Sequence, residues 1–167
     1  LIQALILFKK RFGFELKVIV IGTGKNLRNS KSLARNLTQT VFTGWLPRSL
    51  CLEKIRQSQI CFDGFLDLYL YEYGFSRLKW VDYLAMGKPI IASYSGSPID
   101  VPINEIGWLT QAENPQKLLI LLEDIFINTN GSSLEVIEKS KNGLTWISQN
   151  RRMEILGNKF EKLISKK

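Results

Sequence analysis

The sequence contains no histidine among its 167 residues, and it contains only two cysteines, Cys51 and Cys61. The absence of histidine removes the commonest general base and a frequent metal ligand. Both cysteines lie in apolar segments and form no cluster of ligands, which is typical of buried free thiols in a reducing compartment. Catalysis by histidine is therefore excluded, and no cysteine cluster is available for a metal.

The sequence also lacks any long hydrophobic run. No apolar stretch reaches the length of a membrane-spanning helix, and no segment has the form of a signal peptide. Hydrophobic residues make up 45% of the chain and charged residues 23%, as in a globular protein. The length predicts one domain over residues 1–167, with closing helices over 133–167. Because Leu1 stands inside a helical pattern without an initiator Met, we expect a fragment of a larger protein.

The charge is unbalanced, with 23 lysines and arginines against 15 acidic residues and a net charge of +8. Such an excess occurs in proteins that bind nucleic acid or anionic membranes. Here the basic residues are scattered, with small concentrations at Lys9–Arg11 and Lys166-Lys167, and neither carries the interleaved aromatics that bind single strands. We expect no nucleic-acid partner, and we expect a cytoplasmic protein with at most weak association with the inner face of a membrane.

Hydrophobic periodicity predicts strands that alternate with helices. This alternation is typical of crossover units and predicts an α/β fold with a doubly wound, Rossmann-like parallel sheet. Gly87 is expected to end one helix, and Asn114-Pro115 is expected to begin another. The expected strands are 16–21, 40–44, 59–62, 89–93 and 107–110, and the expected helices are 1–11, 29–36, 50–57, 76–86, 114–126 and two from 133 to the end, with a break near Gly143.

Parallel sheets of this kind bind ligands where the carboxyl ends of the strands meet helix N-termini, an edge called here the carboxyl edge. The loops expected there are Gly22-Thr23-Gly24, Gly44-Trp45-Leu46, Gly74-Phe75-Ser76 and Ser93–Ser97. The first of them, followed by Lys25, suits a phosphate because glycine lets backbone N–H groups approach an anion closely. It lacks the third glycine of the dinucleotide fingerprint, so a plain turn after a strand is an equally good interpretation.

The helix expected after Gly74-Phe75-Ser76 carries charges at a spacing that suits a nucleotide. Ser76 is a good N-cap, and the free N–H groups behind it attract phosphate together with Lys79, one turn further on. Asp82 has the chemistry to accept hydrogen bonds from two vicinal hydroxyls, as acidic residues do with ribose. The alternative is that Lys79 and Asp82 form an exposed ion pair along the helix.

The segment from Tyr73 to Ser93 resembles the donor-site signature of a large family of retaining glycosyltransferases of GT-B fold, called group 1 or family 4. The closest pattern is G-x-S-x-x-K-x-x-D-Y, from the branch that makes capsule and O-antigen sugars. The matching residues are Tyr73-Gly74-Phe75-Ser76, Lys79, Asp82-Tyr83, Ala85 and Gly87–Ser93. The similarity continues in order through Val18–Gly24, Val41–Gly44, Gly107–Leu109, Asn114-Pro115, Lys117-Leu118 and Thr145-Trp146.

The resemblance implies the C-terminal, donor-binding half of such an enzyme, in which a nucleotide-diphosphate sugar gives its glycosyl group to a saccharide or lipid-linked acceptor. Asp82 falls on the second acid of the family's E-x7-E motif and would hold the ribose. The first acid falls on Gly74, which leaves the sugar open. The resemblance identifies no catalytic residue, and it implies donor-binding roles for Gly22, Gly24, Lys25, Leu46, Gly74, Phe75, Ser76, Lys79 and Asp82.

The resemblance also implies what this chain would lack. The Arg and Lys that clamp the diphosphate, and the acceptor-binding N-terminal domain, would precede Leu1, so the isolated chain should be inactive. No cofactor or metal is implied, and no Asp-x-Asp motif is present, since Asp63 and Asp67 are expected in a loop. One alternative is a non-catalytic or split-subunit module that binds a nucleotide sugar and needs a separate acceptor subunit. A more distant one is a sugar-nucleotide epimerase, which normally depends on histidine.

Overall fold

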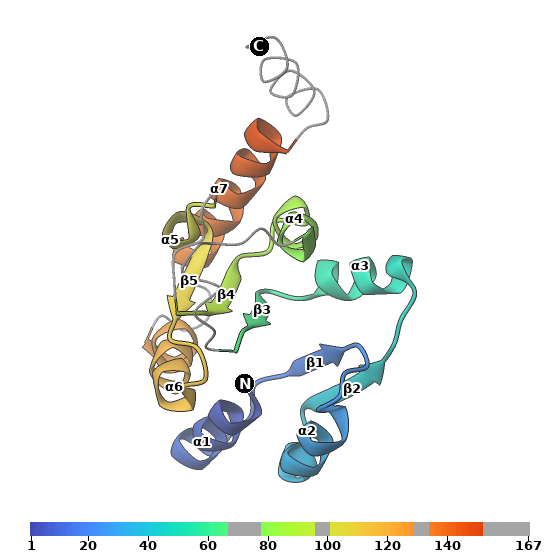
Figure 1. The fold of residues 1–167 in the computed structure, drawn as a ribbon. Coiled ribbons are helices and arrows are strands. Elements are labelled where there is room, and N and C mark those ends of the chain that lie inside the picture. The colour runs from blue at the N-terminus through green and yellow to red at the C-terminus, as the bar shows by residue number, and fades with distance from the viewer. Residues whose placement is uncertain (67–77, 96–100, 129–133, 152–167) are drawn as a thin grey trace.

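The structure is a computed structural model that describes residues 1–66, 78–95, 101–128 and 134–151. Within these residues, parallel strands form two sheets, one of two strands in the order β1-β2 and one of three in the order β3-β4-β5 (Figure 1). The predicted α/β class with parallel strands is confirmed, but the strands divide between two sheets where one was expected. The strands are β1 (Val18–Ile21), β2 (Thr40–Gly44), β3 (Cys61–Gly64), β4 (Ile90–Ser93) and β5 (Gly107–Thr110).

The helices lie close to their predicted positions. The short helix α5 was missed, because four residues are too few to show a helical period. The start predicted at Ser76 lies outside the described residues. The helices are α1 (Ile2–Phe12), α2 (Leu27–Leu33) with a 3-10 turn η1 (Ala34–Asn36), α3 (Arg48–Gln57), α4 (Leu78–Ala85), α5 (Ile103–Ile106), α6 (Pro115–Glu123) with a π-helical turn η3 (Asp124–Asn128), and α7 (Leu134–Asn150).

Two predicted helix ends are confirmed by their hydrogen bonds. Gly87 follows α4 with a φ of 65°, a left-handed conformation that glycine adopts without strain, and the N–H of Lys88 donates to the carbonyl of Tyr83 at 2.9 Å. At the start of α6 the side chain of Asn114 accepts from the N–H of Lys117 at 3.1 Å, with Pro115 in the first turn. Local signals of this kind therefore predicted the element boundaries well.

Successive residues of β4 serve two hydrophobic cores, because side chains of a strand alternate between the faces of the sheet. Ile91 belongs to the core formed with α1 and α6, and Phe8 and Leu118 are fully buried there. Val18 of β1 packs against the same core, so this core connects the two sheets. Ile90 belongs to the other core, which α4, α5 and the aromatic ring of Tyr94 complete.

The break predicted near Gly143 is wrong, because α7 runs without interruption through that residue. A methyl group at Gly143 would lie 2.8 Å from Cδ2 of Leu84 in α4. The glycine therefore permits close packing of α7 against α4. The helix contains it even though glycine has a low helix propensity. In the described part of the chain, no helix has the length and apolarity needed to cross a membrane.

Candidate functional site

The turns that follow β1 and β2 lie together, as predicted for loops of one carboxyl edge. The N–H of Gly22 donates to the carbonyl of Gly44 at 2.7 Å, and Ile21 is the register partner of the same glycine. The φ of Gly22 is 119°, a conformation that side-chain-bearing residues avoid. A methyl group on Gly24 would meet no atom within 4 Å, so packing does not require glycine there. Lys25 lies beside them on the surface.

The side chain of Asp82 lies against the segment that follows β2. The guanidinium of Arg48, the first residue of α3, donates to both carboxylate oxygens of Asp82, at 2.7 and 3.1 Å. The side chain of Asp82 is 25% exposed and that of Arg48 is 73% exposed. The contact brings α4 next to the turn after β2, and it leaves part of the carboxylate open to solvent.

Lys79 and Asp82 do not pair with each other, so the helical ion pair considered above is wrong. The ammonium of Lys79 lies 2.5 Å from Oδ1 of Asp63, while Asp82 pairs with Arg48. The prediction that Asp63 lies in a loop is also wrong, because β3 runs from Cys61 to Gly64 and not from 59 to 62. Strand pairing decides the boundary, since Asp63 pairs with Ala92 of β4 in a parallel ladder.

An exposed aromatic side chain follows β2. The side chain of Trp45 is 72% exposed, whereas Trp80 and Trp108 are buried and have packing roles. Leu46, the next residue, is half-buried, and its carbonyl accepts from the thiol of Cys51 at 3.4 Å. A flat apolar surface, three residues before Arg48 in the sequence, is therefore exposed to a ligand.

Part of the predicted site lies outside the described residues. This holds for Gly74, Phe75 and Ser76, and for the end of the predicted Ser93–Ser97 loop from residue 96 on. Of the predicted donor-binding residues, the structure brings Gly22 close to the segment after β2 and links that segment to Asp82 through Arg48. It places Lys79 one helical turn before Asp82 in α4, with its ammonium paired to the carboxylate of Asp63.

A cavity of about 250 Å³ opens at the carboxyl ends of β3 and β4. Gly64 and Ser93 line it together with Asn114 at the start of α6 and with Leu1. The predicted edge therefore contains a cavity where four chain segments meet. No group of three or more acidic or cysteine side chains suited to a metal ion occurs among the residues that the structure describes.

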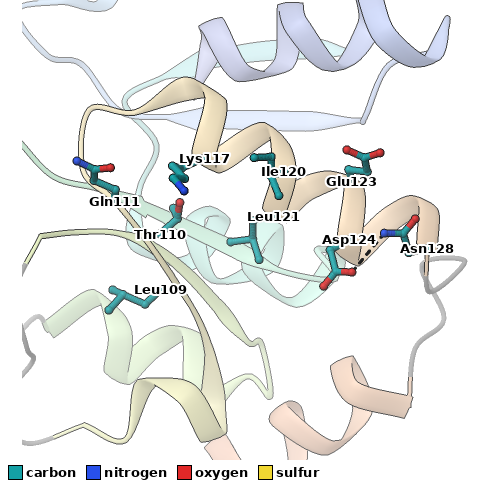
Figure 2. Close-up of a pocket in the computed structure, with 9 residues that line it drawn as sticks. All are labelled: Leu109, Thr110, Gln111, Lys117, Ile120, Leu121, Glu123, Asp124 and Asn128. Atoms are coloured by element: carbon teal, nitrogen blue, oxygen red, sulfur yellow. Dashed lines mark hydrogen bonds between the residues drawn. The ribbon is translucent and has the colours of Figure 1, made fainter.

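A second cavity, of about 430 Å³, lies along β5 and α6 and is shown in Figure 2. Leu109 and Ile120 contribute apolar surface, and the carboxylate of Asp124 accepts a hydrogen bond from Asn128 at 3.3 Å. None of the predicted donor-binding residues lines this cavity in the described part of the chain. It is therefore separate from the predicted site.

Sequence reasoning missed the roles of Arg48 and Asp63, although each carried a signal. A cation in the first turn of a helix is unfavourable beside the positive end of the helix dipole, so Arg48 indicates a partner elsewhere. An aspartate inside the apolar run ICFDGF indicates a buried carboxylate that needs a partner. In both cases the partner comes from α4, more than a dozen residues away, which periodicity does not reveal.

Comparison with solved structures gives consistent likenesses. The C-terminal domain of a group 1 glycosyl transferase family protein, LpcC, from Francisella tularensis superposes with a TM-score of 0.68 at 20% identity, over 91% of this chain and 77% of that one. HepE from Anabaena, in complex with UDP-glucose, gives a TM-score of 0.71 at 16% identity, over 98% of this chain and 44% of that one. A glycosyltransferase from Rickettsia africae gives 0.74 at 15% identity, over 98% and 42%. The chain thus spans less than half the length of the latter two proteins.

Comparison with sequences gives one family. A family model described as glycosyl transferases group 1 matches residues 1–128. No curated protein sequence matches the chain. The family match covers well over half of the 167 residues and includes β1 through η3.

Proposed function

The chain belongs to the group 1 glycosyl transferases, and we propose that it is the domain that binds the nucleotide-diphosphate sugar in a larger enzyme. The intact protein would transfer the glycosyl group to a saccharide or a lipid-linked acceptor. The structure of HepE, whose fold this chain shares, contains UDP-glucose, and this supports a donor of the same class. The domain that binds the acceptor would be supplied by the rest of the protein.

The observation that carries the proposal is the position of Asp82. Arg48 holds its partly exposed carboxylate against the segment that follows β2, and that segment adjoins the turn at Gly22. A partly exposed carboxylate at this place is suited to accept hydrogen bonds from the two hydroxyls of a ribose. The alternative in which Asp82 only neutralises Lys79 is already removed.

With the ribose bound to Asp82, the positions of the diphosphate and the sugar would follow. The diphosphate would lie on the backbone N–H groups at Gly22, Gly24 and the helix start that the sequence predicts at Ser76, close to the ammonium groups of Lys25 and Lys79. Cations and helix N-termini would then stabilise the leaving diphosphate without a metal ion. Gly74 and Phe75 would border the transferred sugar.

The base would lie on the segment after β2. The exposed ring of Trp45 offers a stacking surface, and Leu46 offers apolar contact beside it. Stacking on an aromatic ring tolerates any base, so this contact would add affinity and leave the choice of base to polar groups. We also propose a retaining reaction and a product of the capsule or O-antigen type, as the resemblance of residues 73–93 implies.

The experiment is a calorimetric titration of the intact protein. The nucleoside diphosphate among UDP, GDP, ADP and dTDP that raises its melting temperature most would serve as the probe. Asp82→Asn removes the charge and keeps the size, and we expect a loss of about 1–3 kcal/mol, or roughly 5- to 150-fold in affinity. Asp124→Asn, at the cavity of Figure 2, is the matched control and should leave the affinity unchanged. Equal affinities of Asp82→Asn and the unmodified protein would reject the ribose contact.

A further inference from the structure

Asp63 is a buried carboxylate that the proposed donor contacts do not use. Its side chain is 0% exposed, and it lies within β3 opposite Ala92 of β4. An unpaired carboxylate in such a place is strongly unfavourable, so the residue requires partners. Two groups from the first turn of α4 contact it: Nε1 of Trp80 donates a hydrogen bond to Oδ2 at 2.6 Å, and Nζ of Lys79 forms an ion pair with Oδ1 at 2.5 Å.

The two partners differ in what they can do besides neutralising Asp63. Trp80 is 2% exposed, and its indole belongs to the core under α4. Its N–H therefore fixes the carboxylate from the buried side. The side chain of Lys79 is 42% exposed, so its ammonium touches the buried carboxylate from the solvent side. An ammonium has three N–H donors, and those not directed at Asp63 remain available to a ligand.

We propose that Asp63 is a positioning residue, which holds the ammonium of Lys79 at the first turn of α4 and so presets this cation for the donor diphosphate. The inference rests on the proposed function, in which Lys79 contacts the diphosphate. A free lysine side chain samples many rotamers, and a ligand that must order it loses affinity. Asp63 removes that cost before the ligand arrives, because its own carboxylate is immobilised by Trp80 and by burial.

The test compares a nucleoside diphosphate with its nucleoside in the intact protein. The diphosphate is whichever of UDP, GDP, ADP and dTDP stabilises the protein most, and both ligands are titrated calorimetrically. Asp63→Asn keeps the side-chain size and an acceptor for Trp80, and it turns the amide group toward Lys79. We expect the affinity for the diphosphate to fall roughly three- to tenfold and that for the nucleoside to stay within about twofold.

A double variant shows whether Asp63 acts through Lys79. In the Lys79→Met background, Asp63→Asn should change the affinity for the diphosphate by less than about twofold, because the group that it positions is gone. Glu123→Gln is the matched control, since it removes the carboxylate partner of Arg11 in another ion pair. It should leave both affinities unchanged.

Each result decides the inference. A folded Asp63→Asn protein that loses affinity equally for both ligands, or for neither, would overturn it while leaving Lys79→Met to report on the diphosphate contact. If Lys79→Met keeps the unmodified affinity for the diphosphate, the role of Lys79 in the proposed function fails, and the inference fails with it.

If Asp63→Asn does not fold, the variant Trp80→Phe tests the inference instead. It loosens the carboxylate without removing charge, and it should weaken diphosphate binding by about threefold or more while nucleoside binding stays within about twofold. Any other pattern contradicts the inference.

Discussion

Replacing Arg48 by glutamine tests how the carboxylate of Asp82 becomes available to a ligand. Arg48 donates to both oxygens of Asp82, so a ribose that binds there meets a carboxylate already in use. The pair is exposed on the arginine side, at 73%, and exposed ion pairs contribute only about 0.2–1 kcal/mol. The free energy needed to displace Arg48 is therefore small.

The stability of Arg48→Gln should change by less than about 1 kcal/mol. Loss of the ion pair destabilises the fold, but removal of a cation from the first turn of α3 relieves an unfavourable interaction with the helix dipole of about 0.3–1 kcal/mol. The two effects oppose each other. For a domain of this length the melting temperature should move by no more than about 4 °C, measured by thermal denaturation followed by circular dichroism.

The affinity for the nucleoside diphosphate should stay the same or rise by up to about fivefold, which is the whole strength of the displaced pair. Calorimetry on the intact protein measures it, and Arg56→Gln at the other end of α3 is the control for loss of charge. A decrease of more than about threefold in Arg48→Gln alone would refute the reasoning. It would mean that Arg48 binds the donor itself or that Asp82 binds the ribose only when Arg48 orients its carboxylate.

Three further predictions follow from packing and titration. Gly107→Ala should lower the stability by about 3 kcal/mol or more, seen as a fall in melting temperature of roughly 6–12 °C, because the new methyl group would lie 2.1 Å from the backbone oxygen of Ile90; an unchanged melting temperature would contradict that contact. The hydrogen bond from Lys9 lowers the pKa of Glu15 from 4.5 to about 2, so the stability it contributes should be present above pH 4.5 and lost as the pH falls through about 2. Melting curves of Glu15→Gln should accordingly differ from the unmodified protein at neutral pH and converge with it in acid. Burial raises the pKa of Cys61, so a thiol reagent at neutral pH should label this cysteine only after denaturation.

The elements were largely predictable because their signals are local. The strand at Thr40–Gly44 was predicted to the residue, since β-branched and aromatic side chains end there in a glycine. The end of α4 followed from Gly87, and the start of α6 from Asn114-Pro115. Each of these signals is contained within a few residues of the boundary that it marks, so no knowledge of distant neighbours was needed.

The errors arose where a distant neighbour decides the outcome. Gly143 resembled a helix break, but it is a contact with Leu84 that only the packed structure contains. Asp63 resembled a loop residue until its partners in α4 were known. The same applies to Arg48, whose partner lies 34 residues away. Long-range ion pairs are invisible to a pattern that repeats every two or four residues.

Within the described residues, no ladder of hydrogen bonds joins the two-stranded sheet to the three-stranded one. Along that seam the two sheets share one hydrophobic core, to which Val18 of β1 and Ile91 of β4 both contribute side-chain contacts. A seam of that kind slides more readily than a paired strand does, since contacts between side chains do not fix a register. Small shifts along this seam would move the part of the domain that carries the glycine turns relative to the part that carries α4. The two parts of the proposed nucleotide site would then not form a single rigid unit.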